Sequence, residues 1–284
     1  MCRLVAYLGH EVLIEHVVVK PFNSIVMQSL HARESKIPTN GDGFGLGWYM
    51  PSISPDPGLF TSISPAWNDN NLLHLAAKIK SPCFFAHVRA ASAGGVTQYN
   101  CHPFIFGPWM LMHNGEICHF IEVKRHLRHL LEDDIYHWIQ GETDSEHLFA
   151  LFLQQSRGHD LTKLSVVADV LESTFHKINE LVHQFSKPGA SSFNVCLTDG
   201  KRLVASRFCT HKHKSPETMH YSLGSRFGVT KDRYHLLKED SKRGSLLVAS
   251  EKLTRYEAEW QDVPINHMLL VESDLHIELR PIRF

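Results

Sequence analysis

The chain lacks the features that mark several large classes of protein. Its 29 Lys and Arg residues are balanced by 30 Asp and Glu residues, so it has no basic excess with which to neutralise nucleic-acid phosphates. No segment is apolar over the length of a membrane span, and no basic stretch followed by an apolar run marks a signal peptide. We therefore expect no nucleic-acid partner, no membrane partner and a cytoplasmic location.

Cysteine is also sparse, and its spacing does not suggest a disulfide framework. Two histidine pairs, His126/His129 and His211/His213, lie in segments rich in Lys and Arg that are typical of solvated surface. We expect reduced thiols, no bound metal and no cofactor. The six cysteines are Cys2, Cys83, Cys101, Cys118, Cys196 and Cys209.

Long linkers, repeats and low-complexity tracts are missing as well. The apolar fraction of 43% is enough for a sizeable core in 284 residues. We expect one domain over residues 1–284, with a mature chain that begins at Cys2, and small molecules or proteins as partners.

The hydrophobic pattern predicts strands, then helices, then strands again. We expect a loop at 51–65, which is rich in Pro and Ser, and a hairpin turn at Asp199-Gly200. This order favours an α+β fold in which two packed sheets carry helices outside. The expected strands are 4–8, 44–49, 83–88, 109–112, 193–197, 203–206, 245–249 and 268–271, and the expected helices are 22–31, 71–80, 120–131, 145–155 and 164–185.

Cys2 is the most informative residue, because it directly follows the initiator methionine. Once Met1 is removed, Cys2 carries a thiol and a free α-amine, and the amine can take the proton of the thiol. An α-amine titrates at about 7.7 to 8.0, so much of it is neutral near physiological pH. Taken alone, position 2 favours the simpler interpretation, an ordinary small residue, because a buried cysteine is usually just a small hydrophobe.

Three further positions supply groups that such a nucleophile needs. Arg89 ends an apolar strand and offers a planar fork for a carboxylate. Asn114-Gly115 offers a side-chain amide and a backbone N–H for an oxyanion. Asp144, at the start of a helix, could pair with an ammonium group. Together these groups describe a site for the γ-amide of an α-amino acid.

Each position also has a simpler interpretation. Asn-Gly is a common turn dipeptide, so residues 114–115 could form a hairpin turn. Asp144 could be only a helix N-cap, and Arg89 could pair with an internal acid. The joint presence of all four elements favours the catalytic interpretation.

Five segments of the chain carry a recognisable pattern: Cys2, His-x-Arg-x-Ala-Ser at 87–92, Asn-Cys-His-Pro at 100–103, His-Asn-Gly at 113–115 and Thr-Asp-Ser-Glu at 143–146. In order and composition these segments resemble the class II glutamine amidotransferases, which are N-terminal-nucleophile hydrolases. The resemblance extends to stand-alone members through Gln-Ser-Leu at 28–30, the glycine-rich segment 40–49 and Ala-Ser-Glu at 249–251. Such members include enzymes that hydrolyse γ-glutamyl bonds in compounds other than glutamine, and the yeast glutathione-degrading amidotransferase.

The resemblance implies a four-layer α-β-β-α sandwich and assigns roles by matching motif. It makes Cys2 the nucleophile and the pair Asn114 and Gly115 the oxyanion hole. The implied substrate-binding residues are Arg89 for the α-carboxylate, Asp144 for the α-amine, and Ser92 and His102.

The sequence therefore predicts an N-terminal-cysteine amidohydrolase that cleaves glutamine or a related γ-glutamyl compound to glutamate and ammonia or an amine. Two alternatives stay open. The chain could be a glutaminase subunit that delivers ammonia to a separate synthetase, and a separate synthetase or peptidase subunit is a possible partner. It could instead be a non-catalytic sensor of glutamine or γ-glutamyl peptides.

Overall fold

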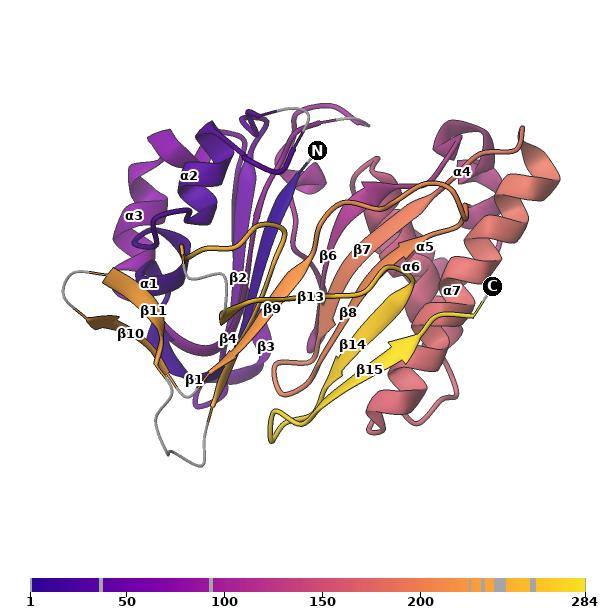
Figure 1. Cartoon of the computed structure of the whole chain (residues 1–284). Coiled ribbons are helices and arrows are strands. Elements are labelled where there is room, and N and C mark those ends of the chain that lie inside the picture. Colours follow the sequence, from indigo (N-terminus) through magenta and orange to yellow (C-terminus); the bar gives the residue numbers. More distant parts are fainter. Residues whose placement is uncertain are drawn as a thin grey trace.

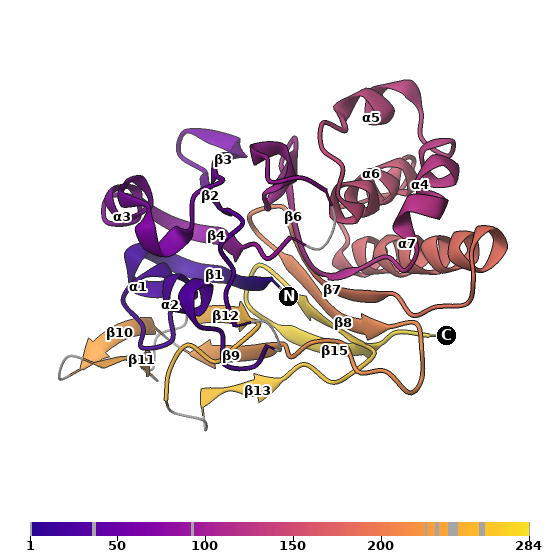
Figure 2. The ribbon, with the colours of Figure 1, turned by 90° about the horizontal axis from the view of Figure 1, so that it is seen from above.

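Two large antiparallel sheets face each other and carry helices on their outer sides (Figure 1). The computed structural model describes residues 2–35, 38–91, 94–224, 226–230, 233–237, 244–255 and 259–283. Seen from above, the N-terminal end of the chain lies between the two sheets (Figure 2).

The first sheet has seven strands, in the order β13-β9-β12-β1-β4-β2-β3. The N-terminal strand β1 is therefore internal, paired with β12 on one side and β4 on the other. The strands are β1 (Arg3–Leu13), β2 (Phe44–Met50), β3 (Ser54–Ser62), β4 (Lys80–Val88), β9 (His220–Gly224), β12 (Ser245–Ala249) and β13 (Gln261–Asp262).

The second sheet has six strands, in the order β15-β14-β8-β7-β6-β5. They are β5 (Phe104–Phe106), β6 (Trp109–Glu116), β7 (Ser192–Thr198), β8 (Leu203–Cys209), β14 (His267–Val271) and β15 (Ile277–Pro281). A separate hairpin joins β10 (Arg226–Thr230) to β11 (Arg233–Leu237).

Helices cover the outer face of each sheet (Figure 1). The first sheet carries α1 (Glu15–Val18), α2 (Ile25–Leu30) and α3 (Asn70–Ala76), and the second carries α4 (Phe120–Arg128), α5 (Asp133–Trp138), α6 (Asp144–Ser156) and α7 (Leu164–Phe185). Short 3₁₀ turns lie at η1 (Ala66–Asn68) and η2 (Gln98–Asn100).

Alternating side chains build a separate apolar core in each space between layers. Along β1, Leu4, Ala6 and Leu8 join the core between the sheets, whereas Val5 and Tyr7 join the core under α1–α3. Because side chains alternate along a strand, the same rule sorts the residues of β4, β6 and β12. The third core lies between the second sheet and its helices. There the helix α7 buries its apolar stripe, and Phe175 stacks on Phe193 with 4.6 Å between the ring centroids.

Most predicted elements are confirmed, including the hairpin turn at Gly200, where φ is +83°. The predicted loop at 51–65 is wrong, because residues 54–62 form β3 and pair with β2. Pro55 and Pro57 suggested a loop, yet β3 is an edge strand, where proline is tolerated. The helix predicted at 71–80 ends at Ala76, and Lys80 already begins β4.

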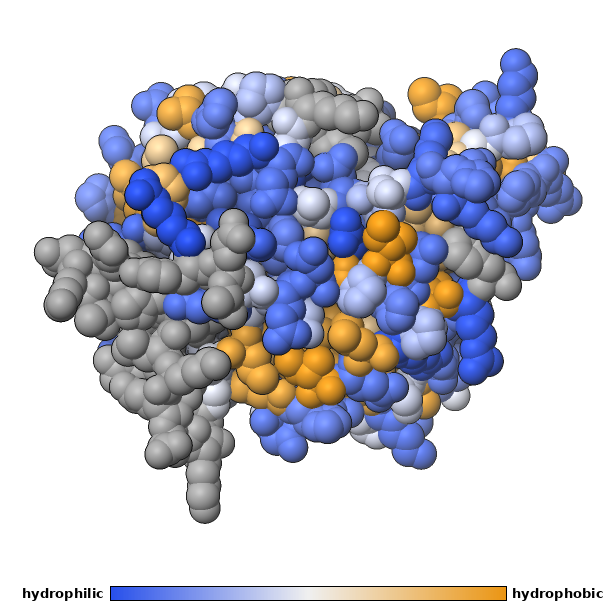
Figure 3. All heavy atoms as spheres, in the orientation of Figure 1, coloured by the Kyte–Doolittle hydropathy of each residue, from blue (hydrophilic) through white to orange (hydrophobic). Residues whose placement is uncertain are grey.

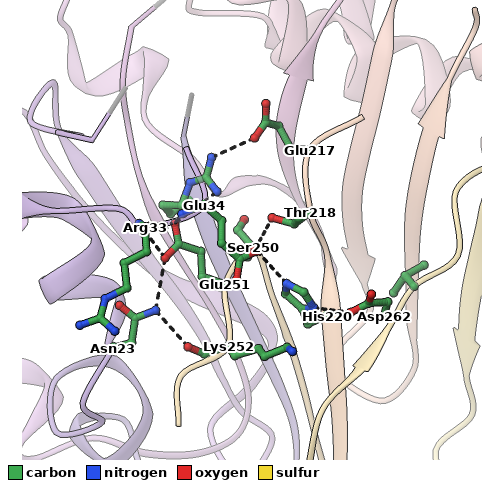
Figure 4. A network of polar contacts seen from close by, with 12 residues as sticks. Asn23, Arg33, Glu34, Glu217, Thr218, His220, Ser250, Glu251, Lys252 and Asp262 are labelled. Atoms are coloured by element: carbon green, nitrogen blue, oxygen red, sulfur yellow. Dashed lines mark hydrogen bonds and ion pairs between the residues drawn. The ribbon is translucent and has the colours of Figure 1, made fainter. Parts of the chain in front are cut away.

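A buried charge network anchors the start of β1 (Figure 4). Arg3 is fully buried, and its guanidinium lies 3.6 Å from the Glu251 carboxylate and 3.4 Å from that of Glu217. The buried Glu251 carboxylate also accepts hydrogen bonds from the backbone N–H groups of Arg33 and Glu34 and from the Asn23 side chain. Glu251 therefore ties the first strand to the segment after α2.

Two histidines are buried against each other near the end of β4. The ring centroids of His87 and His102 lie 4.2 Å apart with the rings tilted by 37°, and His102 also contacts Phe104. Burial lowers the pKa of His87 to about 3, and burial lowers the pKa of His102 well below its usual value. Both rings are therefore neutral at physiological pH.

Hydrophilic side chains dominate the face in Figure 3, and apolar side chains gather in its lower middle, away from the N-terminal end. None of the helices in the described part of the chain combines the length and the apolar character needed to cross a membrane.

Replacing Glu251 with Gln should destabilise the protein strongly. Arg3 would lose its nearest buried carboxylate. The new NH2 group is a donor and would face the backbone N–H donors of Arg33 and Glu34, which now bond to the Glu251 carboxylate. Breaking a buried ion pair typically costs about 3–5 kcal/mol. Urea unfolding measures this loss, and the exposed pair partner Glu180→Gln is the control, with an expected change below about 1 kcal/mol. Equal stability of the two variants would contradict the anchoring role of Glu251.

Acid should destabilise the protein through His87 and His102. The unfolded chain binds protons at these imidazoles near pH 6.5, whereas folded His87 does so only near pH 3. The free energy of unfolding should therefore fall as the pH drops through this window, by up to about 1.4 kcal/mol per pH unit for each group. Urea titrations at several pH values should show a shallower fall for His87→Phe, whereas the exposed control His129→Gln keeps the wild-type slope. An unchanged slope in His87→Phe would exclude this origin.

Candidate active site

The Cys2 thiol lies against the backbone that follows β4. Its Sγ is 3.4 Å from the N–H of Ala90 and 3.5 Å from the C=O of the same residue. Burial raises the pKa of the Cys2 thiol, while the Ala90 N–H and the guanidinium groups of Arg89 and Arg3 act in the opposite direction. The thiol is therefore protonated at neutral pH and needs a base before it can attack a carbonyl.

Strand alternation directs Cys2, Arg89 and Asn114 into the space between the sheets. Leu4, Ala6 and Phe85 belong to the core between the sheets. Cys2 is separated from Leu4 and Ala6, and Arg89 from Phe85, by an even number of positions, so their side chains lie on the same face of the sheet. Arg3 pairs with Val88 across β1 and β4, so residues 2 and 89 lie opposite each other at the ends of the two strands. Asn114 has the parity of Met110 and Met112 and approaches from the second sheet.

Asn114 and Gly115 lie inside β6 and do not form a hairpin turn. Asn114 pairs with Asn194 of β7, whereas β5 pairs only with residues 109–111 on the other edge of β6. The Asn114 side chain is buried, and its Nδ2 donates to Ser250 Oγ at 3.3 Å. A Cβ at position 115 would lie 2.1 Å from the Ser192 carbonyl oxygen, so the backbone passes too closely for any residue but glycine.

The loop after β4 holds the Arg89 guanidinium. It donates to the carbonyl oxygens of Gly95 at 3.0 Å and Gly94 at 3.4 Å, and the residue is almost fully buried. Asn100 fastens this loop, because its Nδ2 donates to Gly95 O and its Oδ1 accepts from Glu142 N. The contact joins the Arg89 loop to the segment that leads to Asp144.

Asp144 is the first residue of α6, and the N-cap is Thr143, whose Oγ1 accepts from Glu146 N. The Asp144 carboxylate accepts from Ile117 N at 2.8 Å and from Ser145 N at 2.9 Å. The interpretation of Asp144 as the cap is therefore wrong by one residue. Its carboxylate is nearly buried and is held next to the end of β6.

Two neighbouring side chains reinforce the start of α6. Glu146 accepts from Gln140 N and Gly141 N, and burial raises its pKa. His113 lies between Ser145 Oγ and the Ser192 carbonyl, at 2.9 and 3.0 Å. Because a carbonyl only accepts, Nε2 of His113 carries a proton, which gives this ring a structural hydrogen-bonding role.

The remaining residues assigned to substrate binding differ in position. His102 is buried against His87 and Phe104, and Gly45 leaves room for its backbone, because a Cβ there would lie 2.0 Å from His102 O. Ser92 lies outside the described residues. Within the described residues, no three His, Cys, Asp or Glu side chains come close enough together to bind a metal ion.

No role for Ser250 or Glu251 was predicted from the sequence, although both contact the residues next to Cys2. Ser250 Oγ accepts from Leu4 N at 3.1 Å as well as from Asn114, and Glu251 faces Arg3. The Ala-Ser-Glu segment at 249–251 was the available signal, but only the fold brings it beside the first strand.

Comparison with known proteins identifies the family of the chain. The profile of the family "Glutamine amidotransferases class-II" matches residues 1–278. The probable glutamine amidotransferase DUG3 of Saccharomyces cerevisiae is 36% identical over 99% of this chain and 84% of its own length. A gamma-glutamyl-hercynylcysteine sulfoxide hydrolase of Mycobacterium tuberculosis is 33% identical over 41% of this chain and 50% of its own length.

Solved structures share the fold. A glutamine aminotransferase class-II domain protein from Silicibacter pomeroyi aligns over the whole of both chains with a TM-score of 0.67 and 22% identity. The glutamine phosphoribosylpyrophosphate amidotransferase of Bacillus subtilis aligns over all of this chain and 50% of its own, with a TM-score of 0.60 and 14% identity. The chain belongs to the class II glutamine amidotransferases, cysteine-type enzymes with the α-β-β-α fold of the N-terminal-nucleophile hydrolases.

Proposed function

We propose that this enzyme hydrolyses the γ-amide of glutamine or of a related γ-glutamyl compound with Cys2 as its nucleophile. The proposal is supported by the strand register that puts Cys2 opposite Arg89 and by the Ser250 hydroxyl, which joins Asn114 to β1. The Asp144 carboxylate is held next to the end of β6. The names of DUG3 and of the mycobacterial γ-glutamyl hydrolase support a small γ-glutamyl substrate.

The first half-reaction forms a thioester. Removal of Met1 frees the α-amine of Cys2, which takes the thiol proton that burial otherwise retains. The sulfur attacks the γ-carbonyl, and Nδ2–H of Asn114 and the N–H of Gly115 stabilise the oxyanion. The amine of Cys2 then passes its proton to the departing nitrogen, and the C–N bond breaks.

The second half-reaction releases glutamate. The neutral Cys2 amine takes a proton from water, and the resulting hydroxide adds to the thioester carbonyl. The oxyanion collapses, the C–S bond breaks, and the sulfur recovers its proton. Throughout, Arg89 binds the α-carboxylate of the glutamyl group, and Asp144 binds its α-ammonium.

A second candidate function is delivery of ammonia to a separate subunit. The Bacillus subtilis amidotransferase aligns with this chain over only half of its own length, so this fold also occurs as one part of a larger enzyme. Adding a candidate synthetase or peptidase subunit should raise glutamine hydrolysis if this chain is such a subunit.

Cys2→Ala should abolish glutamate release from L-glutamine while leaving the thermal unfolding temperature close to that of the wild type. The reason is that alanine removes the nucleophile, whereas β1 stays paired with β4 and β12 through backbone groups that the substitution does not change. Coupled glutamate assays measure activity, and intact-mass measurement verifies removal of Met1. Cys118→Ala, which removes another partly exposed thiol, should keep full activity. Turnover by Cys2→Ala would exclude the mechanism.

Asp144→Asn should weaken recognition of the α-ammonium. The amide oxygen can still accept from Ile117 N, but the negative charge is lost. We expect kcat/KM for L-glutamine to fall by about 10- to 100-fold, in keeping with loss of a charge-assisted hydrogen bond. The wild type should strongly prefer L-glutamine to 4-carbamoylbutanoate, which lacks the amine, and the variant should lose that preference.

The exposed first-turn residue Asp133 of α5 supplies the control for this prediction. Asp133→Asn should retain the wild-type preference for L-glutamine. If Asp144→Asn discriminates between the two compounds as well as the wild type does, Asp144 does not bind the amine.

A further inference from the structure

Ser250 lies directly after β12, where its hydroxyl meets both sheets. Its Oγ accepts from Leu4 N in β1 at 3.1 Å and from Asn114 Nδ2 in β6 at 3.3 Å. The side chain has the parity of Leu246 and Val248, so it points into the space between the sheets. Only 1% of Ser250 is exposed, so solvent does not compete for these bonds.

The backbone of Ser250 is fixed independently of its hydroxyl. Its N–H donates to Leu4 O at 3.0 Å, and its carbonyl accepts from Thr218 Oγ1 at 2.9 Å. Glu251, the next residue, points the other way and meets Arg3 (Figure 4). The hydroxyl is therefore held at a set position beside the first strand.

The hydroxyl of Ser250 binds one of the two N–H hydrogens of the Asn114 amide. A side-chain amide has two N–H hydrogens, and one of those of Asn114 is directed to Ser250 Oγ. This bond leaves the second hydrogen for another acceptor. Because Ser250 Oγ accepts from both Asn114 Nδ2 and Leu4 N, rotation of the amide would replace this bond by one that the Ser250 O–H has to donate to Oδ1.

We propose that Ser250 is a positioning residue for the oxyanion hole, which keeps the Asn114 amide in its donating orientation and in register with the strand that carries Cys2. The proposal rests on the proposed function, because it assigns Ser250 a part in the same reaction. Nucleophile and oxyanion donor come from different sheets, and the apolar packing between these sheets is not directional. A directional contact between them preorganises the site.

A purely structural role predicts different kinetics. Ser250→Ala keeps both backbone contacts but leaves Leu4 N–H without its acceptor, so some loss of stability is expected in either case. Only the positioning role predicts a selective fall in kcat, because Arg89 and Asp144, which bind the glutamyl group, do not contact Ser250 through any hydrogen bond seen among the described residues.

Steady-state kinetics with L-glutamine should compare Ser250→Ala and Ser250→Thr in the wild-type and Asn114→Ala backgrounds. Ser250→Ala should lower kcat by about 10-fold or more with KM changed less than about twofold, and Ser250→Thr, which keeps the hydroxyl, should retain most of kcat. If Ser250 acts through Asn114, Ser250→Ala should change kcat by less than about twofold when Asn114 is already alanine.

Ser206→Ala is the matched control, because Ser206 is also buried and its hydroxyl also bridges two backbone groups, Val195 N and Phe193 O, within the second sheet. This variant should keep the wild-type kcat. An unchanged kcat in Ser250→Ala, or an equal fall in both backgrounds, would overturn the proposal.

Crystal structures of the wild type and Ser250→Ala test the proposal without turnover. The Asn114 amide should rotate or become disordered in the variant, and an amide that keeps its orientation would contradict the proposal. Failure of the wild type to hydrolyse any γ-glutamyl amide would instead count against the proposed function, while this structural comparison would still give its answer.

Discussion

The geometry of the site depends on how the first residues of β1 are held. Cys2 precedes Arg3 and Leu4, and each of these residues is fixed by one member of the Ser250-Glu251 pair. Ser250 acts on the side that faces the second sheet, and Glu251 on the side that faces the helices. A segment more than two hundred residues away in the sequence therefore holds the strand that begins beside Cys2. Because the Glu251 carboxylate opposite Arg3 is buried, this contact is sensitive to loss of either partner.

Strand alternation accounts for how the proposed catalytic groups are brought together. Three strand ends meet at one end of the sandwich, and a period of two places Cys2, Arg89 and Asn114 in the same space. Asp144 comes from the helical layer, yet its bond to Ile117 N fastens it to the end of β6. This end of the sandwich thus combines a thiol, a cation, an amide donor and a carboxylate from three of the four layers.

Much of this arrangement could be predicted from the sequence, because periodicity and motif order are local properties. The strands around Leu4–Leu8 and Cys83–Val88, the long helix α7 and the motifs at 87–92, 113–115 and 143–146 were all recognisable. Contacts between distant segments could not be recognised from the sequence. The Ala-Ser-Glu motif at 249–251 does not indicate which residues Ser250 contacts, since only strand pairing between β1 and β12 brings it to Leu4. The cap at Thr143 was missed because Thr and Asp are both good N-cap residues and differ here by one position.

The outer strands of the two sheets bear on how the molecule behaves at high concentration. An exposed sheet edge can recruit a strand from a second molecule and begin aggregation. Here β3 carries Pro55 and Pro57, which lack the N–H that such pairing requires, and β5 and β13 are short edge strands of the two sheets. The prolines that hid β3 from prediction thus make that edge a poor template for intermolecular β-pairing.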